Sequence, residues 1–187
     1  MKMNLINQAI IFAAKAHMGQ MRKSSDIPYI THPFSVGMLL QKENCSEQVI
    51  AAGILHDTLE DTSATYEQLK DHFGIHVANL VLAASEKDKS LSWEERKKHT
   101  IDSLKEAALE EIQVITADKL HNLITIHSDL DRIGEAVWDR FKRGKVDQHW
   151  YYASMVRELM IHQNECRLIL ELEKEVIEVF GSLEVPY

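Results

Sequence analysis

The sequence is poor in cysteine, proline and glycine, and it lacks long apolar runs. Its two cysteines, Cys45 and Cys166, lie far apart without a paired spacing, which argues against a disulfide framework and favours a reducing compartment. No apolar run approaches the roughly 20 residues that a membrane helix requires, and the N-terminus has no signal-peptide pattern. We therefore expect a cytoplasmic protein with no membrane partner.

Positive charge is also scarce. The chain carries 21 lysines and arginines against 29 aspartates and glutamates, which gives a formal net charge of −8. This balance argues against a nucleic-acid partner, because the affinity of such complexes depends on cationic contacts to phosphates. A small phosphorylated substrate remains compatible with it, since a metal ion and a few basic side chains can reverse the charge inside one pocket. The sequence carries no signal for an oligomeric state.

Apolar residues recur at helical spacing along most of the chain, with only three prolines and seven glycines to interrupt them. No segment alternates apolar and polar residues over a useful length, as a half-buried strand would. Capping-box patterns at residues 65–68 and 92–95 mark two helix starts. We predict one all-α domain over residues 1–187 with about ten helices. Its motif-bearing core covers about residues 5–130, and residues 131–187 form a helical extension.

One stretch concentrates the chemistry. An apolar segment runs directly into the sequence HDTLED at residues 56–61, and we expect one continuous helix through both. Residues three and four apart share a helix face, so His56 would lie beside Glu60, and Asp57 beside both Glu60 and Asp61. An imidazole and three carboxylates at the end of a buried helix are unfavourable unless a cation neutralises them. A solvated helix end is the alternative, which the helix dipole disfavours for carboxylates.

Two further residues complete a candidate metal site with His56 and Asp57. His32 begins a helix after a loop, and Asp118 lies in an otherwise apolar helical segment where it needs a partner. Two imidazoles and two carboxylates leave coordination positions open for water, which is typical of catalytic rather than structural sites. Mixed nitrogen and oxygen ligands favour Mn²⁺, with Fe²⁺, Zn²⁺ and Mg²⁺ as alternatives. Each residue taken singly is more often a hydrogen-bonded core residue, so the prediction depends on their combination.

Other polar side chains are candidates for catalysis and substrate binding. Glu60 and Asp61 follow the expected ligands by one turn, where a carboxylate can orient or deprotonate water; a loop cap is their alternative role. Arg22 and Lys23 lie in a loop and can hold phosphates or stack on a base, although solvated surface charge is the commoner role of such a pair. Asn122 follows the buried aspartate by one helical turn, where it can hold a substrate oxygen.

Four ordered motifs carry a resemblance to a known family. They read AHMGQMRK at residues 16–23, PYITHP at 28–33, LHDTLED at 55–61 and ADKLHN at 117–122. In this order they resemble the motifs of the HD phosphohydrolase superfamily. The resemblance is strongest to the hydrolase domain of RelA/SpoT proteins and to the stand-alone small alarmone hydrolases, and it covers about residues 5–130.

The resemblance implies an enzyme that uses Mn²⁺ to remove the 3′-diphosphate of guanosine tetra- or pentaphosphate, (p)ppGpp. A metal-activated water would attack the phosphorus on the ribose 3′-oxygen and release pyrophosphate. The implied roles are metal binding by His32, His56, Asp57 and Asp118, water activation by Glu60 and Asp61, and nucleotide binding by Arg22, Lys23 and Asn122.

Three places depart from the family pattern near the expected nucleotide. Ser24 follows the Arg-Lys pair where the family commonly has glycine, Ile124 replaces a common arginine, and Ser85-Glu86 replaces a common threonine-lysine pair. These departures leave two alternatives open. One is a phosphohydrolase acting on another nucleotide, such as a phosphorylated dinucleotide cofactor or a nucleoside monophosphate. The other is a nucleotide-binding module that does not catalyse. The presence of Glu60 and Asp61 argues against this alternative.

Overall fold

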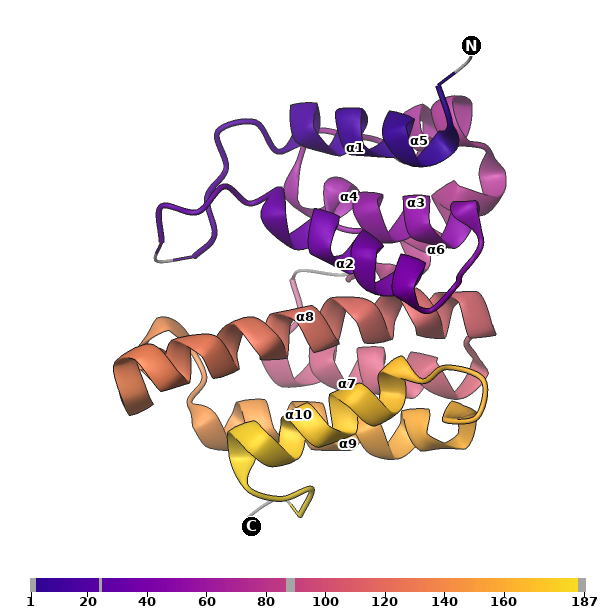
Figure 1. Cartoon of the computed structure of the whole chain (residues 1–187). Helices are drawn as coiled ribbons and strands as arrows, with labels where there is room; N and C mark the ends of the chain where they lie inside the picture. The colour runs from indigo at the N-terminus through magenta and orange to yellow at the C-terminus, as the bar shows by residue number, and fades with distance from the viewer. Residues whose placement is uncertain (1–2, 24, 87–89, 185–187) are drawn as a thin grey trace.

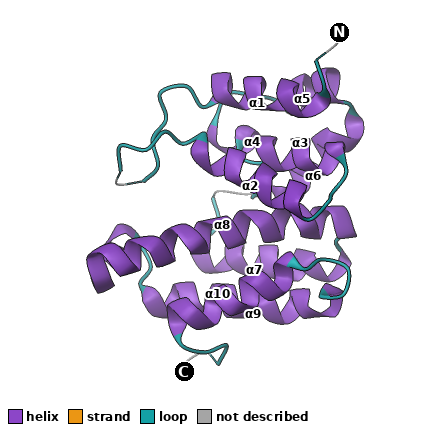
Figure 2. Ribbon diagram, in the orientation of Figure 1, coloured by secondary structure: helices purple, strands orange, loops and turns teal. Residues whose placement is uncertain are grey.

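The structure is a computed structural model that describes residues 3–23, 25–86 and 90–184. Within these ranges the secondary structure is helical and no strand forms; an isolated bridge joins Met21 and Pro28 (Figure 2). The α-helices are α1 Leu5–Ala16, α2 Thr31–Lys42, α3 Glu47–Leu55, α4 Thr58–Asp61, α5 Tyr66–Phe73, α6 Ile75–Ala84, α7 Trp93–Ser103, α8 Leu109–Ile133, α9 Lys145–Leu159 and α10 Leu168–Phe180. The 3-10 helices are η1 Leu104–Glu106, η2 Gly134–Arg140 and η3 Met160–His162. The all-α prediction is confirmed.

Helix α8 runs across the middle of the molecule and contacts both halves. It packs on α2, α3 and α6 on one side and on α10 on the other (Figure 1). The buried apolar cluster extends through both halves and includes Leu55 of α3, Leu120 of α8 and Leu172 of α10, each at most 1% exposed. Any residue of α8 that faces α2 and α3 is therefore held on a rigid, packed element.

The two capping boxes form as the sequence predicts. The Thr65 side chain accepts the backbone N–H of Gln68, and Ser92 accepts that of Glu95, with the reciprocal side-chain bonds present in both.

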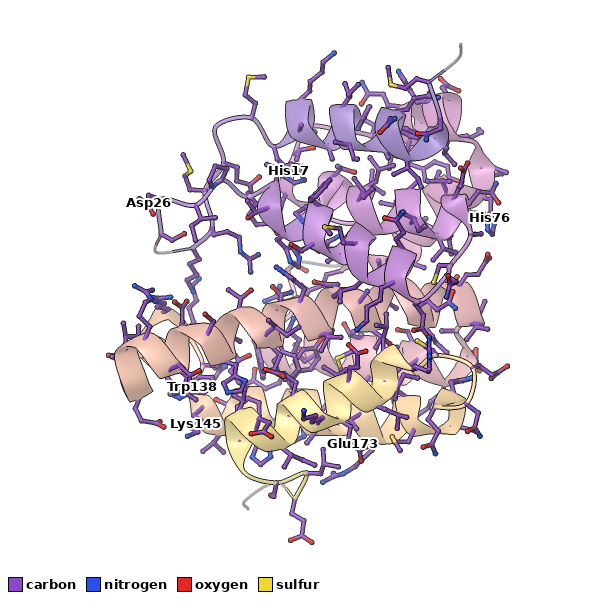
Figure 3. The ribbon with its side chains drawn as sticks, viewed as in Figure 1. His17, Asp26, His76, Trp138, Lys145 and Glu173 are labelled. Carbon is purple, nitrogen blue, oxygen red and sulfur yellow. The ribbon has the colours of Figure 1, made fainter. Side chains whose placement is uncertain are left out.

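Farther along the chain, Lys145 at the start of α9 lies over the ring of Trp138 in η2, with its Nζ 5.8 Å from the ring centroid (Figure 3). Among the described residues, none of the helices combines the length and apolar character needed to cross a bilayer.

The prediction of a continuous helix through residues 56–61 is wrong. Helix α3 ends at Leu55, His56 and Asp57 form a turn, and α4 starts at Thr58. Two side chains explain the interruption, because His56 Nδ1 donates to the carbonyl of Gly53 and Thr58 Oγ1 to that of Leu55, both at 2.7 Å. These carbonyls would otherwise accept backbone N–H groups one turn later. Asp57 consequently adopts φ −89° and ψ −5°, a sparsely occupied region that recurs at active sites.

Helices α2 and α3 approach closely because each carries a glycine at the contact. A Cβ added to Gly37 would lie 2.5 Å from Cγ1 of the buried Ile54. We expect Gly37→Ala to lower the free energy of unfolding by about 1 to 3 kcal/mol, since overpacking outweighs the better helix propensity of alanine. Urea denaturation would measure the loss. Gly144→Ala, with no atom within 4 Å of its Cβ, should cost only about 0.5 kcal/mol; equal losses in both variants would contradict the close-packing explanation.

Candidate metal centre

Four side chains from three places in the chain converge in one buried cluster, named here the His–Asp cluster: His32, His56, Asp57 and Asp118. His32 lies in the first turn of α2, His56 and Asp57 in the turn after α3, and Asp118 in the middle of α8. The Nε2 atoms of His32 and His56 are 3.3 Å apart. Asp118 Oδ1 lies 3.1 Å from His32 Nε2 and 3.5 Å from His56 Nε2. Asp57 Oδ2 lies 3.0 Å from His56 Nε2 and 3.6 Å from His32 Nε2.

The second nitrogen of each cluster histidine is hydrogen-bonded away from the cluster. His56 Nδ1 donates to the backbone carbonyl of Gly53, and His32 Nδ1 lies 2.7 Å from Nδ1 of His121 on α8. Burial and the neighbouring His32 lower the pKa of His121 to about 4, so this imidazole is neutral at pH 7. A histidine held through one ring nitrogen presents the other in a fixed direction, as metal-binding histidines do.

Asp118 is buried and has two further polar neighbours. Lys119 Nζ lies 2.6 Å from Oδ2, and Asn122 Nδ2 donates to Oδ1 at 2.6 Å. Burial opposes ionisation of Asp118, but the charges of Lys119 and His56 outweigh it and hold the pKa of this carboxyl well below its ordinary value. Lys119 thus occupies one carboxylate oxygen and leaves the other directed at the histidines.

The donor set fits a divalent ion. His32, His56 and Asp118 offer ligand atoms within 4.8 Å of one another, and Asp57 adds a fourth at the distances above. Ligands about 2.1 Å from an ion lie about 3.0 Å apart at right angles and about 3.4 Å apart at tetrahedral angles, and the cluster spans 3.0–3.6 Å. The two carboxylates also favour positive charge at His56: although burial lowers the pKa of this imidazole, Asp57 and Asp118 raise it well above its ordinary value.

Tyr29 and Asn122 connect the cluster to the loop before α2. The Tyr29 hydroxyl donates to Asp57 Oδ2 at 2.6 Å, and burial together with Asp57 raises the pKa of this phenol. Asn122, besides its bond to Asp118, accepts a hydrogen bond from Arg22 at 3.1 Å. The structure therefore brings two of the predicted substrate-binding residues, Arg22 and Asn122, into contact with each other beside the cluster. Lys23 instead lies over the ring of Phe141, at 5.5 Å.

The two acidic residues of α4 point into different surroundings. Glu60 Oε2 accepts the backbone N–H of Glu86 at 3.3 Å, which holds this carboxylate against the segment after α6. The charge of Asp61 contributes to the raised pKa of the Tyr29 phenol.

The three departures from the family pattern have different structural contexts. The Ser85 hydroxyl donates to the carbonyl of Val81 at 2.8 Å, and Ile124 on α8 is 39% exposed. Glu86 forms ion pairs with Arg96 and Lys97 of α7 at 2.5 and 2.7 Å. Ser24 lies outside the described residues.

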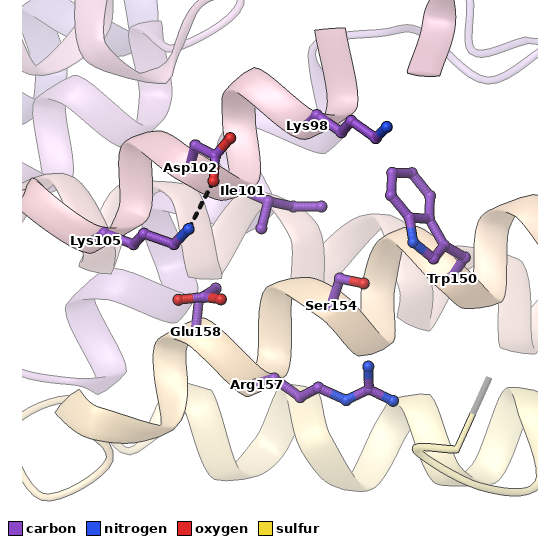
Figure 4. Close-up of a pocket in the computed structure, with 8 residues that line it drawn as sticks. All are labelled: Lys98, Ile101, Asp102, Lys105, Trp150, Ser154, Arg157 and Glu158. Atoms are coloured by element: carbon purple, nitrogen blue, oxygen red, sulfur yellow. Dashed lines mark hydrogen bonds and ion pairs between the residues drawn. The ribbon is translucent and has the colours of Figure 1, made fainter. Parts of the chain in front are cut away.

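A separate cavity of about 210 Å³ lies between α7 and α9 (Figure 4). It is lined by Trp150 and Ser154, by Ile101, and by charged residues such as Lys98 and Arg157. None of its lining residues belongs to the His–Asp cluster or to its hydrogen-bonding partners. We locate the candidate chemistry at the cluster, because two imidazoles and two carboxylates with shifted pKa values converge there.

Comparison with known proteins assigns the family. A protein-family model described as an HD domain matches residues 9–145, which include all four residues of the His–Asp cluster. The chain belongs to the HD domain family. Among its relatives is the guanosine-3′,5′-bis(diphosphate) 3′-pyrophosphohydrolase MESH1 of Xenopus tropicalis, which is 36% identical over 155 residues, 81% of this chain and 82% of that protein.

Larger bacterial proteins contain a segment that is similar to this chain. The bifunctional (p)ppGpp synthase/hydrolase SpoT of Escherichia coli K12 is 37% identical over 129 residues, which cover 66% of this chain and 18% of SpoT. A GTP pyrophosphokinase of Myxococcus xanthus is 36% identical over 167 residues. The chain spans about a fifth of the length of these relatives, 21% in the second case.

Two solved structures share the fold of this HD domain. A Listeria monocytogenes EGD-e protein has a TM-score of 0.75 and 36% identity, and the match covers 81% of this chain and 99% of that one. A metazoan ortholog of SpoT, described as hydrolysing ppGpp, has a TM-score of 0.79 and 29% identity over 97% of this chain and 98% of its own. The helices after residue 130 thus belong to an arrangement that occurs elsewhere.

Three residues that contact the cluster were not predicted: Tyr29, Lys119 and His121. All three lie inside the motifs PYITHP and ADKLHN. His121 follows Asp118 by three residues, a spacing that places both on one helix face and could have identified it. Tyr29 gives no such signal, because its contact with Asp57 joins residues 28 positions apart.

Proposed function

We propose that this chain is a Mn²⁺-dependent (p)ppGpp 3′-pyrophosphohydrolase. The observation that carries the proposal is the convergence of two imidazoles and two carboxylates at 3.0–3.6 Å in a buried cluster. The activity named for MESH1, a relative aligned over most of both chains, supports the substrate. We further propose that residues 1–187 act as one HD domain. Two ion pairs between the end of α2 and the start of α10, Lys42–Glu171 and Glu43–Arg167, support this proposal. The scarcity of cysteine supports a cytoplasmic location.

His32, His56, Asp57 and Asp118 would hold the ion. Mixed imidazole and carboxylate ligands suit Mn²⁺, with Fe²⁺, Zn²⁺ and Mg²⁺ as alternatives. A divalent ion, when bound, acts as a Lewis acid that makes water nucleophilic near neutral pH and neutralises phosphoryl charge. Lys119 would keep Asp118 ionised and oriented through its contact with Oδ2.

The carboxylates of Glu60 and Asp61 would orient the attacking water and accept its proton. The water oxygen bonds to the phosphorus next to the ribose, and the bond from that phosphorus to the ribose 3′-oxygen breaks. Pyrophosphate therefore carries the water oxygen, and the 3′-oxygen of the nucleotide takes up a proton. Such proton transfer by a placed carboxylate typically contributes 10²- to 10⁴-fold to the rate.

Arg22, Lys23 and Asn122 would bind the nucleotide. Arg22 already contacts Asn122, which in turn contacts Asp118, so a phosphate on the guanidinium would lie next to the cluster. A guanidinium suits this role because its planar fork of donors matches phosphate oxygens.

A second candidate substrate is another phosphorylated nucleotide. One basis is the exposed Ile124, which offers no charge to a phosphate. The other is Glu86, which stands where the family commonly has a lysine and whose carboxylate pairs with Arg96 and Lys97. A non-catalytic nucleotide-binding module is a third hypothesis, against which the retained Glu60 and Asp61 count.

Product analysis would separate these functions. We expect the pure protein with Mn²⁺ and ppGpp in ¹⁸O-labelled water to give GDP and pyrophosphate, with the label in pyrophosphate. Turnover no faster than that of Asp57→Ala would reject this substrate. A nucleotide panel assayed for phosphate release would then favour the second candidate if its best substrate lacks a 3′-diphosphate, and the third if a nucleotide binds without turnover at saturating metal.

A further inference from the structure

We propose that Tyr29 is a positioning residue with two separable roles, in which its hydroxyl sets Asp57 for metal binding and its ring sets Arg22 for the nucleotide. The inference rests on the proposed function, since it assigns a role within the same site.

The hydroxyl contacts the oxygen of Asp57 that faces the cluster. It donates to Oδ2 at 2.6 Å, and this oxygen lies 3.0 Å from His56 Nε2. Asp57 lies in the turn between α3 and α4, and its side chain makes no capping hydrogen bond to α4. Its side chain is 17% exposed, so without the phenol it can rotate toward solvent. A hydrogen bond that orients a ligand in this way typically contributes 10- to 100-fold to metal affinity.

The Tyr29 ring contacts two groups of the preceding segment. The centroid of the His17 ring is 5.0 Å away, and the Arg22 guanidinium carbon lies 5.6 Å from the Tyr29 centroid. His17 is buried at the end of α1 (Figure 3), and its Nδ1 is 2.8 Å from Gln20 Oε1. A ring that is packed against a buried imidazole and attracts a guanidinium restricts where the guanidinium can point.

The backbone of Tyr29 closes the base of the loop that carries Arg22. Its N–H donates to the carbonyl of Gln20 at 2.9 Å, and the N–H of Arg22 donates to the carbonyl of Ile27 at 2.8 Å. The loop is thus joined to the cluster at two points: Tyr29 on Asp57, and Arg22 on Asn122. Tyr29 links the metal side of the site to the nucleotide side.

Two substitutions separate the roles. Tyr29→Phe removes the hydroxyl and keeps the ring, so we expect the Kd for Mn²⁺ to rise tenfold or more, with KM for ppGpp unchanged within about twofold at saturating Mn²⁺. Tyr29→Leu removes both, so KM should also rise about fivefold or more. Tyr66→Phe is the matched control, because it removes a hydroxyl bonded at the same 2.6 Å to Asn79, between α5 and α6.

Free Mn²⁺ counted by its EPR signal during titration gives the affinity without any turnover, and steady-state kinetics give KM and kcat. Melting in EDTA should place Tyr29→Phe within a few degrees of Tyr66→Phe, which shows that both variants fold. A Tyr29→Phe protein that binds Mn²⁺ as tightly as Tyr66→Phe would overturn the role of the hydroxyl, and an unchanged KM in Tyr29→Leu would overturn that of the ring. Wild-type protein that binds no Mn²⁺ would instead refute the proposed metal site itself.

Discussion

Replacing Asp57 with alanine is expected to abolish both stoichiometric Mn²⁺ binding and turnover. The substitution removes one of four ligand atoms, Asp57 Oδ2, which accepts a hydrogen bond from Tyr29 and lies 3.0 Å from His56 Nε2. The three ligands that remain would still attract an ion weakly, but the Lewis-acid contribution at neutral pH depends on high occupancy. We expect kcat/KM for ppGpp to fall at least about 10³-fold, a loss of about 4 kcal/mol of transition-state stabilisation.

Thermal unfolding tests Mn²⁺ binding in Asp57→Ala without substrate. Free Mn²⁺ at 100 times its Kd stabilises the wild type by about 2.7 kcal/mol, which raises Tm by about 5 to 10 °C for a protein of this size. Asp57→Ala should show no such increase. Asp71→Ala changes an exposed aspartate of α5 and should behave as the wild type does. A Mn²⁺-dependent rise in Tm of normal size in Asp57→Ala would remove Asp57 from the ligand set.

The second large effect is expected at the two carboxylates of α4. Glu60→Gln and Asp61→Asn each keep the size of the side chain and remove its ability to accept a proton. We expect kcat to fall by about 10² to 10⁴ for a residue that acts as the general base, while the Kd for Mn²⁺ changes by less than about twofold. Isothermal titration with Mn²⁺ and steady-state kinetics on the same preparations would measure both quantities.

The two variants also distinguish the roles of the two carboxylates. The bond from the backbone of Glu86 to Glu60 can be kept by the glutamine oxygen, so a loss in Glu60→Gln reports on charge rather than on the loop. Glu67→Gln, an exposed glutamate of α5 paired with Lys70, is the matched control. Full activity in both Glu60→Gln and Asp61→Asn would show that neither residue handles the proton, whatever the metal does.

Local sequence signals predicted the fold well, because each depends on neighbouring residues. Thr65 with Gln68 and Ser92 with Glu95 form capping boxes within a single turn. The helix break at His56 was not predicted, because the residue pattern there remains helical. The break arises because the His56 and Thr58 side chains donate hydrogen bonds to carbonyls that backbone N–H groups would otherwise use. Helix propensity does not include this competition between side chains and backbone N–H groups for the same carbonyls.

The convergence of His32, His56, Asp57 and Asp118 was predicted from chemistry, since an isolated buried carboxylate or imidazole needs a partner. The surrounding contacts were not predictable in this way. His32 with His121 and Arg22 with Asn122 join residues 89 and 100 positions apart, and only the packing of α2 and of the loop before it against α8 brings them together. The same packing decides that Lys23 lies over Phe141 while Arg22 reaches the cluster.

The most direct test of the central claim is an anomalous difference map from crystals grown with Mn²⁺ and soaked with a nucleotide. We expect one strong Mn²⁺ peak about 2.1 Å from each of the four ligand atoms of the His–Asp cluster, with the 3′-diphosphate beside it and Arg22 on a phosphate. A map in which Asp118 points away from His32 and His56, with no ion between them, would contradict it.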